Sequence, residues 1–246
     1  MIEPDLNAYY GPPSLSTVSY AQAFCTRFVN FTGQQELSEL AAKILWGLRN
    51  LSVLKETANR AESLSYESIS YSDRVELVER ETERLLHDTL QDIESGCGLK
   101  KTRPSIIFTL FAYATLIYIN STFRELVPSF ITTVLAHRLE LGMDLEDAEL
   151  NILLGTFPEL MLWILFIGGG AARPKSKIWF AKTASKILRV QKLEEEADIM
   201  TAYTSFLWPE GRQNYDDSTG EDYEMTDLSE VELAFASVLP SVGITP

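Results

Sequence analysis

The residue types that most often carry catalysis or metal binding are few in this chain. It contains two histidines, His87 and His137, and two cysteines, Cys25 and Cys97. None of the four stands at a short zinc-ligand spacing such as Cys-x-x-Cys or His-x-x-x-His. No Gly-x-Ser-x-Gly elbow and no P-loop occurs in the sequence. We therefore predict no enzymatic activity, no metal site and no cofactor. Catalysis would become a hypothesis only if His137 met carboxylates in a cleft.

Three consecutive glycines, Gly168 to Gly170, follow an apolar run that begins near Pro158. A dinucleotide-binding glycine turn follows a strand, whereas this run has the character of a helix. We expect the glycines at the C-terminal end of that helix. They would either adopt left-handed backbone angles or let another helix come close.

A run of cations follows the glycines. Between Leu160 and Leu193 there is no acid, and seven cations give this stretch a charge of +7. They are Arg173, Lys175, Lys177, Lys182, Lys186, Arg189 and Lys192. Lys182, Lys186 and Arg189 share one helical face by their spacing. We predict either a solvated face or a docking face for something acidic, with nucleic acid and the chain's own tail as alternatives.

The C-terminal segment, residues 210–246, is predicted to be an acidic tail. Nine acids between Glu210 and Glu232 stand against one base, so this stretch carries −8. Apolar residues alternate with the acids, and the candidate anchors are Leu228, Val231, Leu233 and Phe235. Such mixing is typical of disordered segments that fold against a coactivator groove. An acidic loop with a packed final helix is the alternative. The opposite charges also suggest that the tail docks on the basic face.

Composition limits the classes of function. The chain has 246 residues, 46% of them hydrophobic, and a mean hydropathy of −0.02, which is normal for a globular protein. A net charge of −14 makes it a poor non-specific DNA binder, because DNA affinity comes largely from neutralising phosphates. Two cysteines and the lack of a secretory signal lead us to expect ordinary thiols in a reducing compartment.

The elements that must position these residues are helices. Apolar residues recur at helical spacing through most of the chain, and no period-two alternation competes. Thr32 has a capping-box spacing to Gln35, and Pro104 suits a first helical turn. We expect seven to nine helices, and a loop over 61–72. The expected helical segments are 37–51, 73–95, 104–119, a helix after Pro128, 150–154, 160–167, 176–189 and 193–207.

The two most apolar segments are too short to span a bilayer. Ile106–Ile119 is 14 residues long, and Leu160–Ile167 is shorter. A spanning helix needs about 20 apolar residues. We therefore expect buried core helices and no membrane association.

Four stretches resemble the fungal-specific transcription factor domain. They span residues 105–208 in the family's order, whereas regions 1–60 and 210–246 lie outside the resemblance. The stretches are Ala114–Tyr118 with Phe123–Pro128, then Pro158–Ala172, then Arg173-Pro174 with Trp179-Phe180, and finally Phe206–Trp208.

The resemblance implies an all-α regulatory domain that modulates a DNA-binding module, mediates contacts and sometimes senses small molecules. The matched positions are packing positions, so no catalytic residue carries over. The family usually pairs this domain with a binuclear zinc cluster of six thiolates, which two cysteines cannot build. We therefore expect no direct sequence-specific DNA binding from this chain alone.

Together these observations predict an all-α, bundle-like domain over residues 31–209, between an irregular lead-in over 1–30 and the acidic tail. The predicted function is transcription regulation in the nucleus through contacts with the transcriptional machinery or coactivator proteins. A homo- or heterodimer partner and a small-molecule effector are further expected partners. The alternative function is a small-molecule receptor, in which Trp46, Trp163 and Trp179 line an interhelical pocket.

Overall fold

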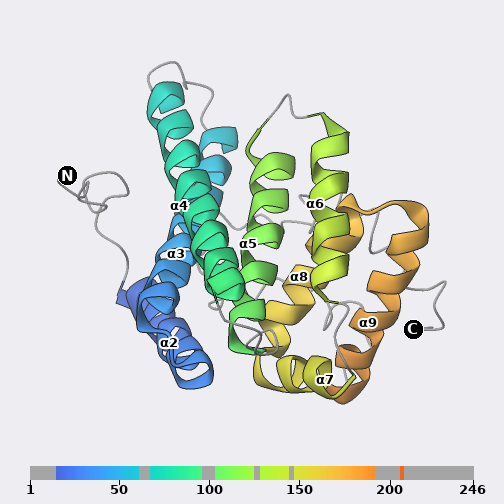
Figure 1. Ribbon diagram of the computed structural model, residues 1–246. Helices are drawn as coiled ribbons and strands as arrows, with labels where there is room; N and C mark the ends of the chain where they lie inside the picture. Colours follow the sequence, from blue (N-terminus) through green and yellow to red (C-terminus); the bar gives the residue numbers. More distant parts are fainter. Residues whose placement is uncertain are drawn as a thin grey trace. The chain divides into compact units, whose positions relative to one another are not determined.

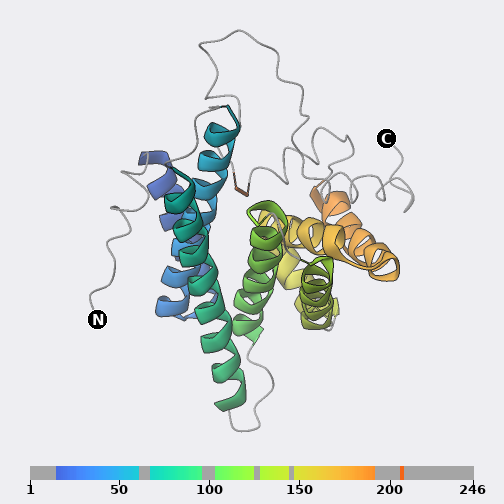
Figure 2. The same cartoon turned by 90° about the horizontal axis from the view of Figure 1, so that it is seen from above.

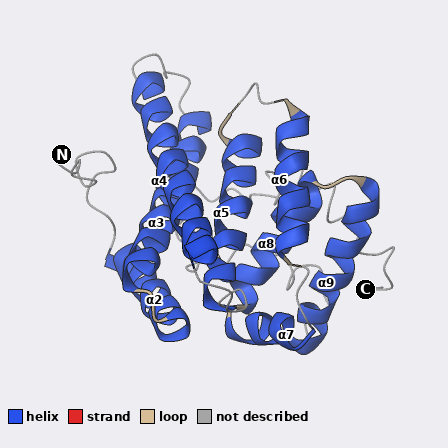
Figure 3. Cartoon of the chain, in the orientation of Figure 1, coloured by secondary structure: helices blue, strands red, loops and turns tan. Residues whose placement is uncertain are grey.

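The computed structural model describes residues 15–60, 67–95, 103–124, 128–143, 147–191 and 206–207. Eight helices and no strand occur within these ranges (Figure 3), which confirms the all-α prediction. The chain divides into two compact units, Met1–Ala112 and Tyr113–Pro246, and the boundary falls inside a helix. The single domain predicted over residues 31–209 includes most of both units.

The first unit contains α2 (Leu15–Thr32), α3 (Gln35–Arg60), α4 (Glu67–Ser95) and the first half of α5 (Arg103–Thr122) (Figure 1). Helix α3 packs against both α2 and α4. Its apolar residues recur at helical spacing and are buried, and they include Leu40, Ile44, Leu45, Leu48 and Leu51. Each large aliphatic side chain of this kind contributes about 1.5–3 kcal/mol when fully buried.

Helix α2 corrects the predicted lead-in, because residues 15–30 are helical and not irregular. Phe24 and Phe28 lie one turn apart on the same face, and both are buried. Their ring centroids lie 5.8 Å from Phe111 and 5.2 Å from Phe108, respectively, both on α5. Burial of two aromatic rings favours a helix here. The prolines that suggest irregular structure all precede residue 15.

The corner between α2 and α3 differs from the predicted capping box. The backbone N–H of Gln34, not that of Gln35, donates to Thr32 Oγ1 at 3.1 Å. Gly33 has a φ of +70°, and its N–H donates to the Val29 carbonyl at 2.8 Å. A left-handed residue that closes a helix end is the position that favours glycine.

Helix α4 begins at Glu67, so the last part of the predicted 61–72 loop is helical. Its end at Ser95 and the place of Pro104 in the first turn of α5 agree with the prediction.

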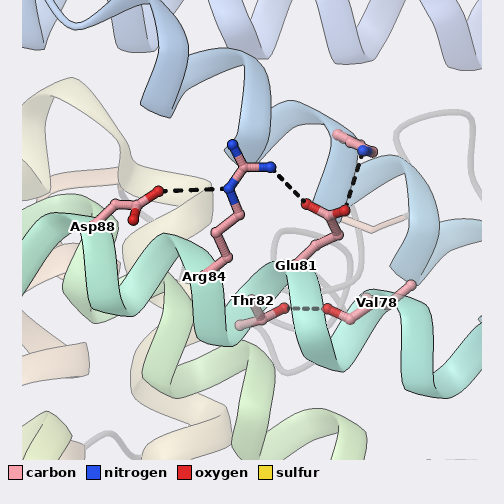
Figure 4. Close-up of polar contacts among 6 residues, drawn as sticks. Val78, Glu81, Thr82, Arg84 and Asp88 are labelled. Carbon is pink, nitrogen blue, oxygen red and sulfur yellow. Dashed lines mark hydrogen bonds and ion pairs between the residues drawn. The ribbon is translucent and has the colours of Figure 1, made fainter. Parts of the chain in front are cut away.

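Lys43 forms an ion pair that links α3 to α4, and Arg84 forms ion pairs within α4 (Figure 4). Lys43 Nζ lies 3.3 Å from Glu81 Oε1, and Arg84 lies 3.9 Å from Glu81 Oε2 and 3.6 Å from Asp88 Oδ2. Below them the buried Thr82 hydroxyl donates to a backbone carbonyl one turn earlier. The exposed Arg84 pairs contribute at most about 1 kcal/mol each. The buried apolar residues of α3 and α4 therefore outweigh them in stabilising this pair of helices.

The second unit contains the rest of α5, α6 (Ser129–Gly142), α7 (Asp147–Thr156), α8 (Pro158–Ala171) and α9 (Pro174–Gln191). Helix α8 packs against α6, α7 and α9 (Figures 1 and 2). Every residue from Leu160 to Gly169 is buried. This confirms the prediction that the apolar run is a core helix.

Helix α5 is also a core helix, buried from Ile106 to Ile119 except for the half-buried Tyr113. None of the described helices is by itself long and apolar enough to cross a bilayer. Glu149–Thr156 and α8 meet the length and composition only as a pair, and they are bent by 110° at the break between them.

Aromatic rings fill the core of the second unit. Trp163 is 0% exposed, and its ring lies 5.8 Å from Tyr118 and 5.0 Å from Phe206. Phe206 and Leu207 are buried and lie in a turn, whereas sequence analysis places them at the end of a 193–207 helix. Residues 192–205 of that predicted helix lie outside the described residues.

Candidate functional site

Helix α9 has a buried side and a cationic exposed side. It begins at Pro174, two residues before the predicted start, and proline suits a first helical position. The side that faces the core is apolar or small, and it includes Phe180, Ala181, Ala184, Ile187 and Leu188. The opposite side carries an exposed row of Lys175, Ile178, Lys182, Lys186 and Arg189, which we call the basic strip.

The residues of the basic strip run along one side of α9. At 3.6 residues per turn its members lie within about 80° of one another, and the row is about 21 Å long. Helix α9 contains no acid among its 18 residues. Arg189 stands in the last turn, where a cation also interacts favourably with the helix dipole. The structure thus places Lys182, Lys186 and Arg189 on one exposed face, and their docking role stays a prediction.

The histidines lie outside any catalytic or metal-binding arrangement in the described ranges. His137 Nδ1 lies 3.6 Å from Glu140 Oε2, and the His137 side chain is 65% exposed. Ser176 at the start of α9 donates to the same Glu140 oxygen at 2.7 Å. His87 is exposed on α4. Within the described residues no three His, Cys, Asp or Glu side chains group to hold a metal ion.

Gly168 on α8 lies at a close contact with α6 and α9. A Cβ atom at this position would lie 2.6 Å from Leu139 Cδ2 and 2.7 Å from Phe180 Cε1. Of the two explanations predicted for the glycines, close approach of another helix is therefore correct for Gly168. The left-handed alternative is wrong, because α8 remains helical through Ala171.

The two cysteines differ in what the structure describes. Cys25 on α2 is a free, half-buried thiol. Burial raises the pKa of Cys25, and the nearby Glu39 carboxylate raises this pKa further. The thiol therefore stays protonated at neutral pH, as the prediction of an ordinary cysteine requires. Cys97 lies outside the described residues.

The four tail anchors also lie outside the described residues, so their role stays a prediction. They are Leu228, Val231, Leu233 and Phe235.

The tryptophans of the predicted receptor pocket have different surroundings. Trp46 is half-buried on α3 in the first unit. In the second unit Trp163 is enclosed by aromatic rings, and Trp179 is half-buried with its ring 5.0 Å from that of Phe180. A small-molecule receptor stays a prediction.

An exposed apolar face on α6 was not predicted from the sequence. Phe130 is 65% exposed, and Val134 and Leu141 are each 51% exposed. The prediction groups Val134 with the apolar side of this helix. The signal that could have revealed a second face is the 4-3-4 spacing of Phe130, Val134, His137 and Leu141, because such residues align along one side of a helix.

A family model for the fungal specific transcription factor domain matches residues 26–202, well over half of the chain. The chain belongs to the fungal specific transcription factor domain family. No curated protein and no solved structure matches the chain.

The match confirms the family resemblance and corrects its extent. Residues 26–60, which sequence analysis leaves outside, lie within the matched range, whereas Phe206–Trp208 follows its end. The fungal specific transcription factor domain thus includes the second half of α2, and it includes α6 and the basic strip. Membership gives this chain a role in transcription regulation.

Proposed function

We propose that this chain regulates transcription in the nucleus through contacts with other proteins, without itself reading DNA bases. Family membership supports the regulatory role. The observation that carries the finer proposal is the basic strip of α9. Four exposed cations and one exposed isoleucine in a row form a surface that a partner can bind.

An acidic protein segment fits this strip better than nucleic acid does. The whole chain carries −14, which repels a polyanion with one negative charge about every 1.7 Å of duplex. A short acidic and apolar segment would place carboxylates against the lysines and one apolar side chain against Ile178. Charge complementarity of this kind speeds association and rejects wrong partners. The partners are therefore acidic segments of the transcriptional machinery or of coactivator proteins.

The acidic tail offers a second type of contact. Leu228, Val231, Leu233 and Phe235 would fill an apolar groove of a coactivator, and the surrounding acids keep the segment soluble until it binds. The tail and the basic strip then serve different partners.

The test is charge reversal on the strip. The full chain is fused to a foreign DNA-binding domain upstream of a reporter gene, and Lys182→Glu/Lys186→Glu is compared with the native sequence. The substitutions turn two attractions to carboxylates of the partner into repulsions, which lowers the binding free energy by several kcal/mol. We therefore expect reporter output to move at least ~10-fold toward that of the foreign domain alone.

The matched control is Arg27→Glu/Arg80→Glu, which makes the same change in net charge at exposed positions of α2 and α4. This control should stay within about twofold of the native output, because neither residue lies on the strip and substitutions at exposed positions usually have small effects. Protein abundance is compared by immunoblot. A strip variant with native output at equal abundance would refute the proposal, as would equal losses in both variants.

A further inference from the structure

One exposed face of α6 carries a row of three apolar side chains and one histidine, which we call the α6 stripe. It consists of Phe130, Val134, His137 and Leu141. The 4-3-4 spacing is that of a coiled-coil seam, and at 3.6 residues per turn the four side chains lie within about 60° of one another. All four are exposed. An exposed apolar row with this spacing is the surface that an amphipathic helix recognises.

Contacts on the other sides of α6 fix the rotation of this helix about its axis, so that the stripe faces solvent. Ala136 and Leu139 are buried on the opposite side. The Thr133 hydroxyl donates to the Ala171 carbonyl at the end of α8, at 3.3 Å. Glu140 accepts the hydrogen bond from Ser176 of α9. A rotation that turned the stripe into the core would break all of these contacts.

The C-terminal tail of the same chain contains a row of apolar residues whose spacing and length are similar to those of the α6 stripe. Leu228, Val231, Phe235 and Val238 are spaced 3-4-3, and Pro240 follows at a point where a helix would end. At a rise of 1.5 Å per residue this row would be about 15 Å long, against about 16 Å for the α6 stripe. Acids such as Glu230 and Glu232 would flank the row, and the exposed Arg138 stands beside the stripe.

We propose that residues 225–239 dock on the α6 stripe as an amphipathic helix. The chain enters the tail from the unit that carries α6, because Phe206 is buried against Trp163. Twenty residues, 208 to 227, separate this point from Leu228, and a random coil of that length reaches about 25 Å. Such a tether gives an effective concentration in the mM range. At ordinary protein concentrations this effective concentration favours binding of the chain's own tail to the stripe over binding of a second copy.

Docking on α6 would compete with the contact between the tail and a coactivator. This regulatory consequence rests on the proposed function, which includes that contact. Leu228, Val231 and Phe235 would be covered, so a coactivator must displace the tail before it can bind. Leu233 lies about 140° from Leu228 on such a helix, opposite the middle of the row, and would face away from α6. This difference between neighbouring anchors gives the experiment its control.

The experiment measures disulfide formation within the full chain, in a Cys25→Ser/Cys97→Ser background. His137→Cys is paired in turn with cysteine at Leu228, Val231, Phe235 and Val238, and with Leu233→Cys as the out-of-phase control. We expect at least one in-phase pair to cross-link ~10-fold faster than the Leu233 pair, because docking raises the local concentration of that side chain. Mixing tagged and untagged chains at micromolar concentration shows whether the bond forms within one chain.

Three outcomes would overturn the inference. Equal rates for in-phase and Leu233 pairs would mean that the tail does not dock on α6. Bonds between tagged and untagged chains would mean that a second copy covers the stripe. Faster cross-linking of the same tail cysteines to Lys182→Cys than to His137→Cys would place the tail on the basic strip. The first two results leave the reporter assay of Lys182→Glu/Lys186→Glu unaffected, so the docking on α6 can fail while the proposed function of the strip holds.

Discussion

Replacing Trp163 with alanine is expected to lower the free energy of unfolding by about 3–5 kcal/mol. The side chain is fully buried in α8, between the rings of Tyr118 and Phe206. Its removal takes away the largest of the fully buried side chains. It leaves a cavity that α8 cannot fill, because this helix packs against α6, α7 and α9. Whole domains are stable by only about 5–15 kcal/mol, so the loss is a large share of the total.

Urea unfolding followed by far-ultraviolet circular dichroism measures this change. Trp179→Ala is the matched control, because it removes the same atoms from a half-buried site on α9. We expect Trp179→Ala to lower the free energy of unfolding by at most about half as much as Trp163→Ala, because folding buries less of the apolar surface of Trp179. Equal destabilisation by the two substitutions would contradict the central position of Trp163 in this core.

Replacing Gly168 with valine is expected to destabilise the protein by about 3 kcal/mol, because overpacking a filled core forces side chains off their rotamers. The first added carbon would already lie 2.6 Å from Leu139 Cδ2 and 2.7 Å from Phe180 Cε1. Leu139 and Phe180 are both fully buried, so neither has room to move away. Helix α9 would have to shift outward, and the basic strip would shift with it.

The control for this prediction is Gly155→Val on α7. A Cβ atom at Gly155 would meet nothing within 4 Å, and the position is exposed. We expect a change within about 0.5 kcal/mol in the same urea experiment. If Gly168→Val behaved like Gly155→Val, the close contact of α8 with α6 and α9 would be wrong.

Local patterns in the sequence were enough to predict the helical fold and part of the basic strip. Lys182, Lys186 and Arg189 lie on one helix, so their common face follows from the helical repeat alone. The sequence did not predict that Lys175 and Ile178 also belong to this face, for two reasons. The predicted helix began after Lys175, and an isoleucine is ordinarily assigned to the core.

Features that depend on contacts between distant segments could not be predicted in the same way. Helix α6 has apolar residues on more than one side, and only its packing against α8 and α9 decides which side is buried. Gly168 shows the same limit. Its spacing suggested a close approach, but Leu139 and Phe180 come near it only in the folded unit. Helix α2 was missed because its stabilising partners, Phe108 and Phe111, lie far along the chain.

The most direct test of regulation through protein contacts is photo-cross-linking at the basic strip in living fungal cells. A benzophenone side chain replaces Ile178 in the full chain, which leaves every cation of the strip in place, and the same group at the exposed His87 of α4 is the control. We expect position 178, and not position 87, to capture a transcription protein through an acidic segment that mass spectrometry identifies. Capture of nucleic acid at position 178, or the same adducts at both positions, would contradict the proposed role of the strip.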